Sequence, residues 1–406
     1  MNACQVHVYM RQCTCMKLLF SVPSGYHLRE LVLPLRRHLE ANNDIAEVYV
    51  VTPAAPIAGS IFQEFGVKFF YHENPKNDDG YRELFKKIQP DRVITNTVGH
   101  DSLDEPILRI AKEMGIATVT FIASWDNVWK IERLIQSKIP IALADRFIVW
   151  NSMMKEHLMR IFPHILESDI AIIGAPRLDY FFHKDKIDSK ETVYEKLGFL
   201  DITRPFIHIA TTELYPMEYI FKTIREGIDS GTIKNNPYLY SSVHPGGSLE
   251  KYKAFEKYGV TVRFSPGRKE HISLRSFTYA PTEEDIFFLL GVFTHASVLV
   301  NHSSTVALES LVAGVPVINV KYGKTFDWWN WRRCMVYRDF QQHYDDLVSD
   351  GATYIAKSKK ELVQSIVAAS NNPLAKDPER AITVKKMITT TDGTTSKQVL
   401  DFIMAL

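Results

Sequence analysis

The chain has 406 residues, of which 46% are hydrophobic and 23% charged, a balance typical of a globular protein of two or three domains. Its 48 lysines and arginines nearly cancel its 47 aspartates and glutamates, so no overall positive field indicates a nucleic-acid partner. We find no apolar run of about 18 residues and expect no transmembrane helix.

The four cysteines are Cys4, Cys13, Cys15 and Cys334. Their spacing fits neither a disulfide framework nor a zinc site, so we expect a reducing, cytoplasmic compartment. Residues 1–15 precede the first strand-like run, and we predict that they form a disordered extension.

Apolar runs of strand length alternate with helical patterns through the first half of the chain. We expect strands at 17–22, 46–52, 67–71, 91–95, 117–122, 146–150 and 170–173, and helices at 27–42, 81–88, 104–114 and 152–162. This alternation predicts a parallel sheet covered on both faces.

A polar segment at 183–196 interrupts the pattern, which then resumes. We expect strands at 206–210, 238–243, 260–264, 297–300 and 315–320, and helices at 217–229, 249–258, 283–293 and 305–313. The sequence therefore predicts two doubly wound, Rossmann-like α/β domains, 16–190 and 200–390, with a ligand cleft between them. A final helix within 391–406 is predicted to pack back on the first domain.

The first strand ends in a turn that contains Gly25 and leads to His27. Gly25 permits close approach of a ligand to the backbone. His27 is either a general base or hydroxyl-binding residue at the cleft, or a polar cap without chemistry. The turn is not GxGxxG and no P-loop occurs, which argues against a dinucleotide or ATP.

Trp125-Asp126-Asn127 follows the fifth expected strand. Asp126 either takes a proton or holds sugar hydroxyls, or it is a helix cap, a role that suits Asn127 equally. Trp125 is either the floor of a sugar site or part of the core. Arg177, after the seventh strand, either reaches a phosphate or acceptor or forms a hinge salt bridge.

Asp78-Asp79-Gly80 resembles a carboxylate pair, but we interpret it mainly as a surface turn and helix cap. No set of His, Cys and carboxylate residues has the spacing of metal ligands. We therefore expect neither a metal nor a bound cofactor.

His244-Pro245-Gly246 ends a strand of the second domain. The imidazole of His244 is either a donor to a diphosphate or a loop side chain satisfied by the backbone. Pro245 fixes the direction of the chain.

The most informative segment is Asn301-His302-Ser303-Ser304-Thr305, between a predicted strand and a predicted helix. Free N–H groups at a helix start, together with three hydroxyls, suit a phosphate or diphosphate. Of Asn301 and His302, one is expected to line the site and the other to support it. Glu309 lies on the face of the helix that carries Thr305, where it either accepts ribose hydroxyls or complements the helix dipole.

These motifs resemble those of the GT-B glycosyltransferase superfamily over residues 16–406. The Ser303-Ser304-Thr305 and Glu309 block is the most specific part of the resemblance, which implies that the second domain holds the nucleotide of an activated donor and the first holds the acceptor. The His-Pro and Ser-Ser pairs are also similar to those of sialyl- and Kdo-type transferases and CDP-glycerol glycerophosphotransferases. The UDP-N-acetylglucosamine 2-epimerases share the architecture.

We therefore predict a metal-independent glycosyltransferase that moves a sugar from a nucleotide-sugar donor to a carbohydrate or lipid-linked acceptor, in surface polysaccharide or glycolipid synthesis. It would contact a membrane at most peripherally. A nucleotide-sugar epimerase and a glycerophosphotransferase are the alternatives.

Overall fold

A computed structural model describes residues 15–23, 27–53, 66, 68–96, 104–212, 216–244, 247–270, 278–279, 281–323, 340 and 342–406. The predictions for residues 1–14, Gly25, Pro245 and Gly246 lie outside these ranges. Among the helices of the described ranges, none is both long and apolar enough to span a bilayer.

The first half of the chain forms a seven-stranded parallel sheet in the order β3-β2-β1-β4-β5-β6-β7. The winding direction reverses between β1 and β4, as in a Rossmann sheet. The strands are β1 (Met16–Ser21), β2 (Ile45–Thr52), β3 (Phe69–Glu73), β4 (Arg92–Thr95), β5 (Ala117–Phe121), β6 (Arg146–Val149) and β7 (Ile170–Ile172). The helices between them are η1 (Leu28–Val32), α2 (Leu33–Ala41), α4 (Asp78–Ile88), α5 (Asp104–Glu113), α6 (Asn127–Gln136) and α7 (Ser152–Ile161).

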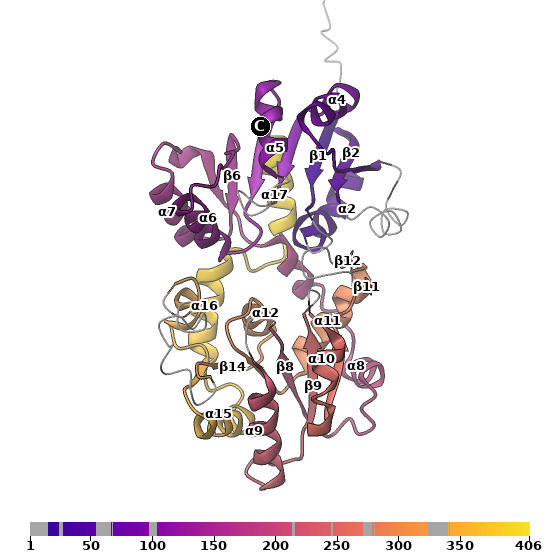
Figure 1. Cartoon of the computed structure of the whole chain (residues 1–406). Coiled ribbons are helices and arrows are strands. Elements are labelled where there is room, and N and C mark those ends of the chain that lie inside the picture. Colours follow the sequence, from indigo (N-terminus) through magenta and orange to yellow (C-terminus); the bar gives the residue numbers. More distant parts are fainter. Residues whose placement is uncertain are drawn as a thin grey trace, which may run out of the picture.

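The second half forms a six-stranded parallel sheet in the order β10-β9-β8-β13-β14-β15, which reverses between β8 and β13. Its strands are β8 (Phe206–Ala210), β9 (Tyr238–Val243), β10 (Val260–Phe264), β13 (Val298–Asn301), β14 (Val317–Val320) and β15 (Tyr354–Ala356). β11 (Arg268–Glu270) and β12 (Thr278–Tyr279) form a separate antiparallel pair. Its helices are α9 (Glu218–Asp229), α10 (Leu249–Lys253), η4 (Glu256–Tyr258), α11 (Glu283–His295), α12 (Val306–Val312), α14 (Asp345–Val348), α15 (Lys359–Asn371) and α16 (Asp377–Ile388). The two sheets, one in each half of the molecule, confirm the predicted fold class (Figure 1).

The segment between the sheets is more ordered than its polar sequence suggests. It contains η3 (Pro176–Phe182) and α8 (Lys190–Leu197), whereas η2 (Glu167–Asp169) precedes β7 in the first half. The prediction of a polar interruption at 183–196 is wrong for α8, because Val193, Tyr194 and Leu197 are buried. Their spacing is helical, and they pack against α11 of the second half.

The chain returns to the first half near its end. The helix α17 (Thr395–Met404) contacts α2 and η3, and Figure 1 shows it in yellow among the elements of the first sheet. Asp179 of η3 caps this helix, because its carboxylate accepts from the backbone N–H groups of Thr395 at 3.2 Å and Ser396 at 2.6 Å. Gly174 lies beside the returning chain at φ +128°, and a Cβ there would approach the backbone oxygen of Ile388 to 2.7 Å.

Candidate active site

The two sheets meet at the edges where their strands end. Arg29, which follows the end of β1, forms a buried ion pair with Glu309, which follows the end of β13. The indole N–H of Trp125, just beyond β5, donates to the backbone oxygen of His343 in the second half at 3.2 Å. Both points of strand-order reversal therefore face the domain boundary, where doubly wound sheets bind ligands.

Asn301, the last residue of β13, is fully buried and its side chain bonds to the turn that follows the strand. Its Oδ1 accepts from the backbone N–H of Ser304 and from the hydroxyl of Tyr344, each at 3.1 Å. Its Nδ2 donates to Oδ1 of Asn319 on β14 at 3.0 Å. Asn301 thus fixes the shape of the turn rather than facing a ligand.

His302 also supports the turn. Its Nδ1 lies 2.8 Å from the backbone oxygen of Val320 and its Nε2 lies 3.2 Å from the Tyr219 hydroxyl. Burial lowers the pKa of His302 to about 4, although its bond to Val320 raises it, so the ring is neutral near pH 7. Because Val320 offers only an acceptor, Nδ1 carries the proton.

Ser303, Ser304 and Thr305 are the partly exposed residues of this turn. The helix that follows, α12, is short and ends before Gly314, which has the left-handed φ of +83°. The three residues are therefore the partly exposed hydroxyl-bearing groups at the second reversal point.

Glu309 belongs to a buried charge network that crosses the domain boundary. Besides the Arg29–Glu309 pair, Arg177 donates to Glu30 at 2.7 Å and lies over the Trp150 ring at 5.2 Å. Burial and the charge of Glu309 raise the pKa of Glu30, and the two arginines oppose them. Arg177 thus pairs with Glu30, within the first half of the chain.

Asp126 lies just beyond β5 and is partly exposed. Burial raises the pKa of Asp126, but the Lys130 ammonium, 2.9 Å from its carboxylate, and the nearby His343 together hold it well below its usual range. Asn127 accepts from the same Lys130 at 3.0 Å and is buried. A carboxylate of such low pKa is a weak proton acceptor and is better suited to orienting a hydroxyl.

Trp125 is 2% exposed and packs against Trp150 at a ring distance of 6.0 Å. Its ring is part of the core, and its N–H connects the two halves of the chain. The described contacts therefore match the core alternative for this residue.

His27 precedes η1 and is partly exposed. Its backbone oxygen accepts from Nδ2 of Asn96 at 2.9 Å. Asn96 directly follows β4, is fully buried, and its Oδ1 has no hydrogen-bond partner in the described part of the chain. Asn96 is not among the residues predicted from the sequence, although a polar residue that follows a buried strand at the reversal point is a local signal of a site.

His244 is exposed at the end of β9. Its backbone N–H donates to the hydroxyl of Thr211 at 3.1 Å, and Thr211 follows the end of the neighbouring strand β8. His244 therefore lies at the edge of the second sheet where β8 and β9 end.

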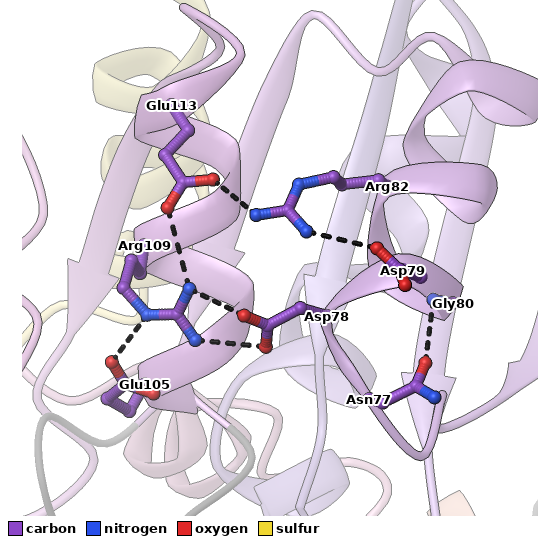
Figure 2. Close-up of polar contacts among 8 residues, drawn as sticks. All are labelled: Asn77, Asp78, Asp79, Gly80, Arg82, Glu105, Arg109 and Glu113. Atoms are coloured by element: carbon purple, nitrogen blue, oxygen red, sulfur yellow. Dashed lines mark hydrogen bonds and ion pairs between the residues drawn. The ribbon is translucent and has the colours of Figure 1, made fainter.

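Asp78 and Asp79 lie elsewhere, in the first turn of α4, which Asn77 caps through the N–H of Gly80. Figure 2 shows both carboxylates within a surface network between α4 and α5. Asp78 accepts twice from Arg109, at 3.0 Å each, and Asp79 pairs with Arg82 at 3.2 Å. These contacts match a helix cap reinforced by surface ion pairs.

Across the described ranges, no three His, Cys, Asp or Glu side chains gather in a way that could hold a metal ion.

No protein-family model and no curated protein matches the sequence. Solved structures do match it over nearly its full length. The UDP-GlcNAc 2-epimerase from Neisseria meningitidis bound to UDP-GlcNAc superposes with a TM-score of 0.65 at 12% identity, covering 96% of this chain and 100% of that one. S. aureus MnaA, solved with UDP, gives 0.62 at 15% identity and 96% coverage of both chains. Anabaena Alr3699/HepE in complex with UDP gives 0.53 at 11% identity, covering 96% and 100%.

The chain has the GT-B fold. The matched proteins include both epimerases and glycosyltransferases, such as that of Rickettsia africae at a TM-score of 0.55, 12% identity, and 96% and 98% coverage. At these identities the likeness is one of fold, and it confirms the GT-B resemblance drawn from the sequence.

Proposed function

We propose that this GT-B protein is a glycosyltransferase that uses a nucleotide-activated sugar. The observation that carries the proposal is the position of the Ser303–Thr305 turn. It lies at the reversal point of the second sheet, and Glu309 on the helix that follows it pairs with Arg29, which follows the reversal point of the first sheet. His27 and Asp126 also follow strands of the first sheet.

The second half would hold the donor. As the bond between the sugar carbon and the diphosphate breaks, the electron pair leaves on a diphosphate oxygen, and negative charge grows there. The hydroxyls of Ser303, Ser304 and Thr305, with His244 at the adjacent strand end, are placed to donate to such a group. UDP in the structures of MnaA and HepE supports a nucleotide diphosphate as the ligand.

The first half would hold the acceptor. The acceptor hydroxyl attacks the sugar carbon and gives up its proton to a base. We assign His27 as that base, because the Lys130 and His343 charges leave Asp126 a poor proton acceptor. Asp126 would instead accept a hydrogen bond from the acceptor and orient it.

A nucleotide-sugar epimerase is the second candidate. The proteins described as UDP-GlcNAc 2-epimerases superpose with higher TM-scores, 0.60 to 0.65, than the glycosyltransferase from Rickettsia africae, 0.55. An epimerase inverts a carbon of the donor sugar and needs no acceptor, which separates the two candidates experimentally.

The test is incubation of the protein with UDP-N-acetylhexosamines, first alone and then with a panel of sugar and lipid-linked acceptors. Products are followed by NMR and by the release of UDP. A glycosyltransferase releases UDP only when an acceptor is present, whereas an epimerised UDP-sugar without acceptor assigns the second candidate. His27→Gln is expected to abolish transfer and retain UDP binding, and Asp78→Asn on the distant surface network is the matched control.

A further inference from the structure

Two adjacent charged residues, Arg29 and Glu30, are buried in the single-turn helix η1, in which all five residues are buried. Arg29 pairs with Glu309 of α12, and the two side chains are 7% and 2% exposed. Glu30 pairs with Arg177 of η3, and these are 0% and 1% exposed. Of the two charged side chains of η1, Arg29 therefore pairs with a residue of the second domain and Glu30 with a residue of the first.

The Arg29–Glu309 ion pair depends on how the domains are arranged. Arg29 lies on η1 of the first half and Glu309 on α12 of the second, so moving the two domains apart breaks the pair and exposes both charges to water. A buried ion pair adds little net stability but strongly favours the one geometry in which both charges are matched. The pair is thus suited to hold one arrangement of the domains.

The same ion pair blocks access of a ligand to the carboxylate of Glu309. Glu309 lies one helical turn beyond the Ser303–Thr305 turn, near enough for a ligand there to extend along α12. Its carboxylate is 2% exposed and occupied by Arg29, so ligand hydroxyls reach it only if Arg29 moves. The neighbouring carboxylate of Glu30 is also buried, and it is held by Arg177.

We propose that Arg29 competes with the donor nucleotide for Glu309. With the donor site empty, the Arg29–Glu309 pair holds the domains together, and when a nucleotide diphosphate binds at the turn, its ribose hydroxyls replace Arg29 on Glu309. The domain boundary is then free to rearrange around the donor. The identity of the ligand rests on the proposed function, whereas the role of the ion pair in the ligand-free protein does not.

The first measurement is the radius of gyration of the ligand-free protein by small-angle X-ray scattering, for wild type, Arg29→Met and Arg37→Met. Arg37 is the matched control, because it forms an ion pair with Glu283 of α11 at 3.1 Å, also between the halves, but is half exposed. We expect Arg29→Met to be larger than wild type and Arg37→Met to be unchanged. Glu309→Gln breaks the same pair with little change of shape and should also expand the protein. Unchanged dimensions in folded Arg29→Met or Glu309→Gln overturn the proposal.

The second measurement is UDP affinity by calorimetry. Removing the competitor should tighten UDP binding by about 5- to 150-fold, the usual range of coupling between two sites. In the Glu309→Gln background, Arg29→Met should change UDP affinity little, because the carboxylate for which Arg29 and the ribose compete is then absent. Equal or weaker UDP binding by Arg29→Met contradicts the competition. Failure of wild type to bind UDP instead contradicts the nucleotide assignment, and the scattering result then decides the role of the ion pair by itself.

Discussion

Replacing Asn301 with alanine is expected to destabilise the second domain strongly, because the side chain of Asn301 is fully buried and hydrogen-bonded. The side chain joins three groups: the backbone N–H of Ser304, the Tyr344 hydroxyl and the Asn319 carboxamide. Each buried hydrogen bond contributes about 1 kcal/mol net, so losing three destabilises by about 3 kcal/mol. The unpaired N–H of Ser304 also frees the turn that we assign to the donor phosphates.

Tyr344→Phe is the matched comparison. It removes a hydroxyl that bonds Asn301 at 3.1 Å and Asn319 at 2.9 Å, but both amides keep another partner, so we expect a loss of about 1 kcal/mol. Urea unfolding followed by tryptophan fluorescence measures both variants, and calorimetry with UDP measures the turn. If Asn301→Ala is no less stable than Tyr344→Phe, the network does not support the turn and this reasoning is refuted.

Three further predictions concern buried or half-buried charges. His302→Asn should be less stable than wild type at pH 7. The difference in unfolding free energy should shrink by about 3 kcal/mol as pH falls from about 6.5 to 4, because the unfolded wild type binds a proton that folded His302, with a pKa of about 4, does not. A difference that does not depend on pH in urea titrations contradicts this. Asp346, whose pKa burial raises to about 6, opposes folding as it ionises. Asp346→Asn should therefore be more stable than wild type by about 1 kcal/mol at pH 8, allowing for the partial exposure of Asp346, and as stable as wild type below about pH 4. If the variant and wild type are equally stable at both pH values, ionised Asp346 does not oppose folding. Asp179→Ala removes the cap of α17 and should lower the unfolding free energy of the protein by about 2 kcal/mol. Amide hydrogen exchange in residues 395–404 should become faster, and unchanged exchange there would show that α17 does not depend on this cap.

The fold was predictable because its signals are local. Buried runs of strand length such as those of β1, β8 and β13 alternate with helical patterns, and that alternation leaves few arrangements besides parallel sheets. Missed elements also had local signals. Ser358 caps α15 through the N–H of Glu361, and this S-x-x-E pattern is readable from the sequence.

The site was predictable only in part, because its charges are paired over long distances in the chain. Arg29 and Glu309 are 280 positions apart, and Arg177 and Glu30 are 147 apart. No periodicity or spacing identifies such partners, so a buried ion pair and a free ligand-binding carboxylate look alike in sequence. The pair of Asp126 with Lys130 is different: it is an i, i+4 pair whose effect on the Asp126 pKa could have been anticipated.

The central claim is that the Ser303–Thr305 turn holds a nucleotide diphosphate at the domain boundary. The most direct measurement is the thermal stability of wild type and Ser304→Ala against UDP, CMP, CDP, GDP and dTDP, because a ligand that binds only the folded state stabilises it by about 2.7 kcal/mol at a hundred times its Kd. The account predicts that one nucleoside diphosphate raises the Tm of wild type and raises that of Ser304→Ala clearly less. It is contradicted if no nucleotide raises the Tm, or if the two proteins respond equally.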